Sequence, residues 1–211
     1  MSSDSQPDLL ALHGVRVTGF ADTARIAARF GLDVAATEES LRDAEARGWT
    51  THTSFGDTAG WSLTERGRAE NERQLAAELT EVGGEADVRG AHRDFVPLNA
   101  VVLGACTDWQ VKPAPGDRLV SNDHTDPRWD AGVLRELAAV DRALGPLVAR
   151  LEAVLARFGG YDTRFSAALE RAEAGDTAWV DRTDVGSCHR VWFELHEDLI
   201  ATLGIDRASL S

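Results

Sequence analysis

A glycine turn between two helix-forming stretches near the N-terminus limits the folds that this chain can adopt. Asp22 or Thr23 begins the first stretch, which ends at Phe30, and Asp33 begins the second, which runs to about residue 47. The side chains of these residues accept hydrogen bonds from the free amide groups at a helix start, so we expect them to be N-caps. Gly31 lies between the stretches, and glycine adopts a left-handed turn at little cost. The pattern predicts two consecutive helices joined by a tight turn.

Two further helices flank this pair. An apolar stretch that begins at about Leu9 predicts a preceding helix, which closes near Gly14 or Gly19. On the other side, a long polar helix is expected from Thr64 to about Leu79. The N-terminal segment is therefore expected to be mainly helical.

A β-hairpin is expected between the third and fourth of these helices. Residues 49–53 and 60–63 are rich in β-forming types, and residues 55–59 between them have the composition of a turn. Gly48 ends the third helix, and we expect a side chain to be poorly tolerated there. We also expect Trp49 to pack on the inner face of the hairpin.

The predicted order of helix, helix, turn, helix, hairpin and helix is that of a winged helix-turn-helix domain. Residues 26–50, IAARFGLDVAATEESLRDAEARGWT, and residues 61–75, WSLTERGRAENERQL, resemble MarR- and PadR-type transcriptional regulators. The shared features are the glycine turn, the recognition helix, the glycine–aromatic exit and the "-LT-x-x-G-R" step out of the wing. The same residues resemble winged-helix segments fused to, or partnering, bacterial phosphoenolpyruvate-utilising phosphotransferases. The resemblance covers about 70 of 211 residues and implies a winged helix-turn-helix domain over residues 1–82.

A second domain, residues 88–211, is expected to be a helical bundle that senses a ligand or dimerises. A glycine-containing segment, residues 81–85, is the expected hinge before it. The helices are expected at about 95–110, 126–158, 161–175 and 185–203, with a break or bend near Gly145–Pro146 and a Pro/Gly loop at 113–122. The whole chain is therefore predicted to be mainly α-helical.

The negative charge of the predicted winged-helix domain argues against binding to DNA, which is the usual ligand of this fold. In a DNA-bound winged helix, the third helix enters the major groove and arginine or lysine side chains meet phosphates around it. Four outward positions of the third helix are acidic, Glu38, Glu39, Asp43 and Glu45, and only Arg42 is basic. Residues 1–80 hold 8 arginines and 13 carboxylates, a net charge of −5. Carboxylates repel phosphates, and binding through counterion release requires cations.

Two functions therefore remain open, because the winged-helix fold serves both DNA and protein partners. The first, which is the function that we predict, is a transcriptional regulator whose second domain binds a small-molecule effector or dimerises. Its candidate DNA-binding residues are Arg25, Arg29, Thr37, Arg42, Arg66 and Arg68, and Arg16 and Arg73 are further possible phosphate contacts. The second is an adaptor without DNA binding, whose acidic third helix docks on a basic protein surface such as that of a metabolic phosphotransferase.

The second domain contains a candidate ligand pocket. His189 and His196 are seven residues apart, so they share one face of the last helix, and Trp192 lies between them. We expect both imidazoles to point into the bundle. Three interpretations are open: a plain core, an organic-ligand pocket, or a divalent metal held by His189, His196 and His124. The candidate pocket residues are Asn99, Trp109, His124, His189, Trp192 and His196.

An enzyme is not predicted, and no cofactor is expected apart from the metal considered above. The chain has no GxSxG, phosphate-binding loop or CxxC motif. Four carboxylates near the last histidine, Glu194, Glu197, Asp198 and Asp206, are expected at solvated positions.

A cytoplasmic location without membrane contact is expected. No stretch approaches the roughly 20 apolar residues that span a bilayer, and the first ten residues do not have the pattern of a secretion signal. Cys106 and Cys188 lie in apolar segments far apart in the sequence, which predicts two buried free thiols.

Overall fold

The computed structural model describes residues 2–56, 58–114 and 117–205 and is mostly helical. Chain contacts divide it into two compact units. The first comprises Met1–Arg89, Glu152–Arg157 and His196–Ser211, and the second comprises Gly90–Leu151 and Phe158–Leu195. The expected boundary between residues 82 and 88 lies close to the end of the first of these segments. Two later segments that we assigned to the second domain are grouped with the first unit.

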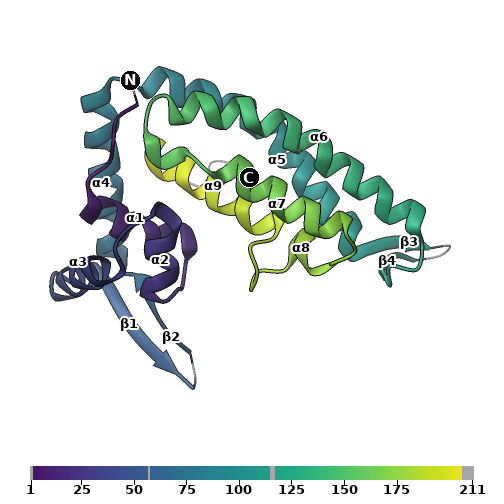
Figure 1. Ribbon diagram of the computed structural model, residues 1–211, viewed down its shortest axis with the longest axis horizontal. Coiled ribbons are helices and arrows are strands. Elements are labelled where there is room, and N and C mark those ends of the chain that lie inside the picture. The colour runs from purple at the N-terminus through teal and green to yellow at the C-terminus, as the bar shows by residue number, and fades with distance from the viewer. Residues whose placement is uncertain (1, 57, 115–116, 206–211) are drawn as a thin grey trace. The chain divides into compact units, whose positions relative to one another are not determined.

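The first unit begins with three helices, α1 (Pro7–Thr18), α2 (Thr23–Phe30) and α3 (Val34–Ala46), shown in Figure 1. Asp22 caps α2 by accepting a hydrogen bond from the Arg25 amide at 2.7 Å, and Asp33 caps α3 through the Ala36 amide at 2.9 Å. Gly31 between them has φ +65°. The predicted caps and turn are thus confirmed.

A β-hairpin follows α3, as predicted. Strands β1 (Thr50–Phe55) and β2 (Thr58–Leu63) are antiparallel, with Thr50 opposite Leu63. Gly48 precedes the hairpin with φ +74°, a conformation that strains residues with a side chain. This explains why glycine stands where α3 gives way to β1.

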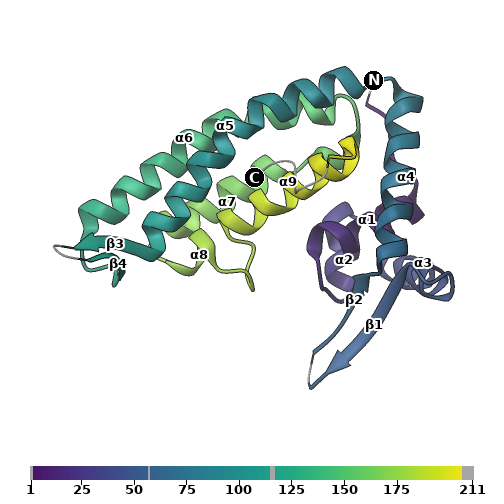
Figure 2. The ribbon, with the colours of Figure 1, turned by 180° about the vertical axis from the view of Figure 1, so that it is seen from behind.

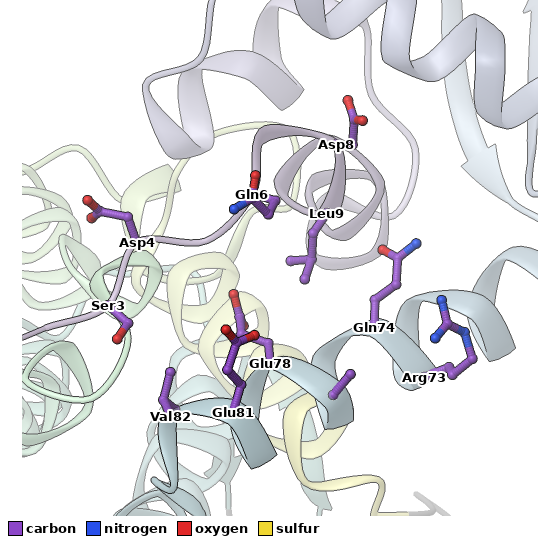
Figure 3. Close-up of a pocket in the computed structure, with 11 residues that line it drawn as sticks. Ser3, Asp4, Gln6, Asp8, Leu9, Arg73, Gln74, Glu78, Glu81 and Val82 are labelled. Atoms are coloured by element: carbon purple, nitrogen blue, oxygen red, sulfur yellow. The ribbon is translucent and has the colours of Figure 1, made fainter.

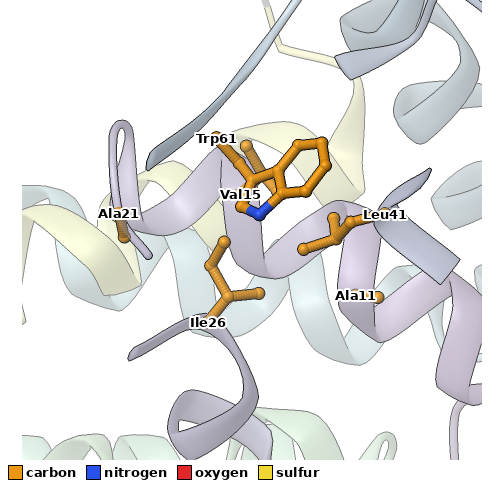
Figure 4. Packing of buried hydrophobic residues seen from close by; sticks show 6 residues of the cluster. All are labelled: Ala11, Val15, Ala21, Ile26, Leu41 and Trp61. Carbon is orange, nitrogen blue, oxygen red and sulfur yellow. The ribbon is translucent and has the colours of Figure 1, made fainter. Parts of the chain in front are cut away.

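The tryptophan that anchors the hairpin is Trp61 rather than Trp49. Trp61 is fully buried in a cluster with residues of α1, α2 and α3 (Figure 4), and its Nε1 donates to the Thr23 hydroxyl at 3.0 Å. Trp49 is only half-buried and lies beneath the Arg47 guanidinium. The expectation for Trp49 was wrong because Trp61 also pairs its backbone with Ala21, which brings its ring over the helices.

Helix α4 (Glu65–Val82) follows the hairpin. The Thr64 hydroxyl caps it by accepting a hydrogen bond from the Gly67 amide at 3.0 Å. Gly67 packs directly on backbone, since a Cβ at this position would lie 1.8 Å from the Trp49 carbonyl oxygen. The glycine of the "-LT-x-x-G-R" step is therefore required by packing. Gly83, with φ +65°, ends α4.

The second unit is built around two long helices, α5 (Glu85–Gln110) and α6 (Pro127–Glu152). They run side by side in Figures 1 and 2 and are antiparallel, because Arg150 pairs with Asp94 while the Trp129 indole donates to the Asp108 carbonyl at the other end. Helix α7 (Tyr161–Glu173), the short α8 (Ala178–Asp181) and α9 (Cys188–Leu203) follow. A 3₁₀ turn, η1 (Ala156–Phe158), precedes α7.

Side chains from three helices meet in the core of the second unit. The Trp192 ring of α9 stacks on Phe95 of α5 at 4.5 Å and meets the edge of Phe165 of α7 at 6.0 Å. Cys106 and Cys188 are buried free thiols, as predicted, and burial raises the pKa of each to about 12.

Three of the secondary-structure elements after residue 84 differ from those predicted from the sequence. The predicted Pro/Gly loop contains an antiparallel pair, β3 (Val111–Ala114) and β4 (Asp117–Ser121). Helix α6 continues through Pro146 as a helix and ends at Glu152 rather than near 158. Helix α5 begins at Glu85, ten residues earlier than expected. No helix within the described ranges is long and apolar enough to cross a membrane.

Candidate functional site

The exposed face of α3 carries an arginine that is held by its own helix. Arg42 donates from Nε to Glu38 at 3.0 Å and from Nη1 to Glu45 at 3.2 Å. Its guanidinium also lies 4.9 Å from the centre of the Trp61 ring. The charge of Arg42 is thus balanced by two carboxylates one turn away on either side. A phosphate approaching Arg42 would meet those carboxylates as well.

The surroundings of Glu38 favour the ionised form of its carboxyl group. The Thr23 hydroxyl donates a hydrogen bond to it, and this bond together with Arg42 lowers the pKa of the Glu38 carboxyl, against a smaller opposing effect of burial. The carboxylate is therefore a fixed negative charge at neutral pH. The residues further along the exposed face, Glu39 and Asp43, add two more carboxylates.

The hairpin beside α3 exposes an aromatic side chain near its tip. Phe55, at the end of β1, is 89% exposed, and Thr51, Thr53 and Ser54 are exposed along the same strand. Neither strand contains arginine or lysine, and His52 packs on Trp61 at 4.6 Å. The tip offers a large apolar side chain and hydroxyl groups.

The structure does not gather the predicted DNA-binding residues into one cationic surface. Thr37 is buried, with its hydroxyl donating to the Asp33 carbonyl at 2.7 Å, which follows from its place on the inner stripe of α3. Arg68 pairs with Glu197 at 3.3 Å, and Arg29 donates to the Arg157 carbonyl at 3.4 Å. Arg25 and Arg66 are exposed on α2 and α4. The further candidate Arg16 is buried, and Arg73 pairs with Glu70.

A buried ionic cluster in the first unit was not predicted. Asp198 of α9 has no exposed surface and accepts from His13 Nε2 at 3.0 Å and from the Arg157 guanidinium. Arg157 also donates to Glu78 at 3.0 Å and to the Thr202 hydroxyl at 2.8 Å. We call these five residues the Asp198 cluster. It ties α1, α4, the 3₁₀ turn and the end of α9 together.

A second ion pair lies one residue away on α9. Glu197 is buried and accepts from Arg16 Nε at 2.8 Å, and Arg16 also pairs with Glu72 at 2.8 Å. The expectation that Glu194, Glu197 and Asp198 are solvated was wrong, since all three are buried. Arg164 and Arg190 pair with Glu194 in the second unit. Asp206 lies outside the described residues.

The burial of Asp198 had a signal in the sequence. Val191, Leu195, Asp198 and Thr202 follow at intervals of four, three and four residues, which is the spacing of one inner helix stripe. What this spacing does not show is where the compensating cations come from.

A pocket in the first unit has a volume of about 690 Å³ (Figure 3). The N-terminal segment and α4 line it, and the lining includes Asp4, Asp8, Glu78 and Glu81 against a single arginine, Arg73. Its charge is therefore predominantly negative. Sequence reasoning did not identify this pocket, because the segment before α1 has no regular pattern.

In the second unit, two of the predicted pocket residues lie together. His124, with φ +57°, places Nδ1 3.0 Å from Asp130, and its ring lies 4.6 Å from that of Trp109. Asn122 bridges the same groups by donating to Asp130 at 2.9 Å and to the Trp109 carbonyl at 3.1 Å. This arrangement fastens the loop before α6 to the end of α5.

The other predicted pocket residues do not join them. Asn99 accepts from Trp192 Nε1 at 2.9 Å inside the bundle. His189 and His196 share a face of α9, but that face is its outer one: both are half-buried, and Phe193 between them is 45% exposed. The expectation that both imidazoles point into the bundle was wrong, because they lie on either side of the exposed Phe193, whereas Trp192 is the residue of this segment that packs into the core. Within the described residues, no group of three or more His, Cys, Asp or Glu side chains is placed to hold a metal ion.

Comparison of the chain with protein-family models, curated proteins and solved structures finds no match.

Proposed function

We propose that residues 7–82 form a winged helix-turn-helix module that docks on a protein partner through α3 and the tip of the β1–β2 hairpin. In this proposal α3 has the place of the recognition helix and the hairpin is the wing. The element order and the two capped helices around Gly31 support the module. The observation that carries the choice of partner is the pairing of Arg42 with both Glu38 and Glu45.

The electrostatics of α3 favour a protein over DNA. The four carboxylates of α3 outnumber its single arginine, and that arginine is already shared by two of them. A DNA-binding surface gains affinity from cations that replace counterions on phosphates. This face would instead attract a surface that carries arginine or lysine.

The hairpin adds the apolar part of the docking surface. A phenylalanine that is 89% exposed costs solvation free energy unless a partner covers it. Large aromatic side chains at the centre of an interface contribute much of its binding energy. The expected partner therefore has a basic surface beside an apolar pocket that receives Phe55.

Site-specific photocrosslinking tests the proposal in cells of the source organism. With p-benzoylphenylalanine in place of Phe55, we expect one predominant protein adduct. The same group in place of Ala143, an exposed residue of α6, is the matched control and should not form it. Asp43→Arg in the Phe55-labelled chain should weaken the adduct by reversing charge. Adducts with DNA, or equal adducts at both positions, would contradict docking through the wing.

The second candidate is a DNA-binding transcriptional regulator, favoured by the element order alone. It predicts that selection from a random duplex library enriches one sequence. It also predicts that Arg42→Ala weakens binding to that sequence, with a reduced salt dependence between about 50 and 200 mM. The adaptor proposal predicts no enriched sequence, and only weak binding that falls steeply over that salt range.

A further inference from the structure

One helix of the second unit leaves a large apolar face exposed. Val96, Val101 and Leu103 of α5 are 47%, 40% and 49% exposed. The neighbouring exposed positions, Pro97, Ala100, Gly104 and Thr107, carry no charge either. We call these seven residues the α5 face. Their spacing of three and four residues places them on one side of the helix, opposite the buried Phe95, Val102 and Trp109.

The exposed side of α6, in the same unit, is a solvated helix surface with which the α5 face can be compared. It carries charged side chains along its length, at Arg128, Arg135, Glu136, Arg142 and Arg150. In contrast, residues 95–107 of α5 contain no charged residue, although 27% of the chain is charged. An uncharged helix face with three large aliphatic side chains is typical of an interface.

Opposite charges stand at the two ends of the α5 face. Arg93 is exposed one turn before Val96, and Asp108 follows Thr107 at the other end. If two copies of α5 pack antiparallel about a two-fold axis midway between positions 100 and 101, Arg93 of one copy lies beside Asp108 of the other. Because the axis is two-fold, the dimer then contains two equivalent contacts between Arg93 and Asp108.

We propose that the α5 face is the contact surface of a homodimer in which two copies of α5 pack antiparallel. The chain carries a net charge of −13, so two copies repel each other over most surfaces and least where they are uncharged. In this register Pro97 faces Gly104, and Ala100 faces Val101. The side of Gly104 on which a Cβ would stand has no atom within 4 Å, and small side chains there allow two helix axes to approach closely.

Light scattering and sedimentation measure the molecular mass of the full chain in solution. This mass tests whether the α5 face is the contact surface of a dimer. We expect a dimer for the wild type and a monomer for Leu103→Glu, which buries a charge at the interface. Ala143→Glu on the solvated side of α6 is the matched control and should remain a dimer. Circular dichroism establishes that each variant is folded. A monomeric wild type, or a dimer unchanged by Leu103→Glu, overturns the proposal.

A charge exchange tests the antiparallel register. Arg93→Asp and Asp108→Arg should each weaken the dimer at least tenfold, because each places like charges together twice. Mixing the two variants should restore a heterodimer with opposite charges at both contacts, and salt should weaken it. If the mixture stays monomeric while Leu103→Glu also abolishes the wild-type dimer, this register is wrong. Dimers of either single variant as strong as the wild type would also overturn it.

Discussion

At the scale of single residues, Asp198 is a carboxylate without exposed surface whose charge depends on its partners. Burial raises the pKa of its carboxyl, but the Arg157 guanidinium and His13 lower it further, so that it lies below its ordinary range. Removing one partner of a buried ion pair leaves the other without compensation, which costs about 3–5 kcal/mol. The Asp198 cluster therefore holds the first unit together only while the carboxylate is ionised.

We expect Asp198→Asn to lower the free energy of unfolding by about 3–5 kcal/mol at pH 7. The pKa of Asp198 is lower in the folded state than the unfolded value of about 3.9. Its contribution is therefore fully present above that value and is lost as the pH falls toward the folded pKa. The difference in the free energy of unfolding between the wild type and Asp198→Asn should therefore become smaller below about pH 4. Urea unfolding at pH 7 and pH 3 measures it, with the exposed Glu136→Gln as control.

At the scale of elements, the position of α4 against the hairpin entrance depends on the absence of one side chain. A Cβ on Gly67 would overlap the Trp49 carbonyl, which is backbone and cannot rotate away. We expect Gly67→Ala to destabilise the protein by about 1–3 kcal/mol or more. Gly132→Ala in α6, where the nearest atom is an arginine tip at 3.8 Å, should instead stabilise it by about 0.5–1 kcal/mol. Equal effects in thermal unfolding would contradict the packing argument.

At the scale of the whole molecule, the first unit is completed by chain that lies more than 100 residues beyond α4. Glu197 and Asp198 are the partners of Arg16 and His13, and Ala201 packs in a buried cluster with Leu9 and Leu75. The end of α9 is therefore part of the core of the first unit.

We therefore expect the fragment of residues 1–89 to unfold at a lower temperature than the full chain, or to lack a cooperative transition. A peptide of residues 188–205 added in trans should raise its melting temperature, because it restores the partners of His13 and Arg16. Circular dichroism during heating measures both. A fragment as stable as the intact chain would show that the buried ion pairs contribute nothing to the first unit.

Short-range signals were enough to predict the helix caps and glycine turns within the first 80 residues. Asp22 and Asp33 cap helices, and Gly31 and Gly48 adopt positive φ, because these effects act within a few residues of the chain. The mainly helical class followed from the same signals. Where tertiary contacts compete with local pattern, as for Trp49 against Trp61, the expectation failed.

The burial of charged and polar groups depends on contacts between residues that are far apart in the chain. Asp198 meets Arg157 at a separation of 41 residues, and Glu197 meets Arg16 at 181. The helical pattern shows which side of α9 carries these carboxylates. It does not show whether arginine or histidine side chains of other elements lie opposite that side. In water an isolated carboxylate is solvated, and only a partner at hydrogen-bond distance offsets the cost of burying it.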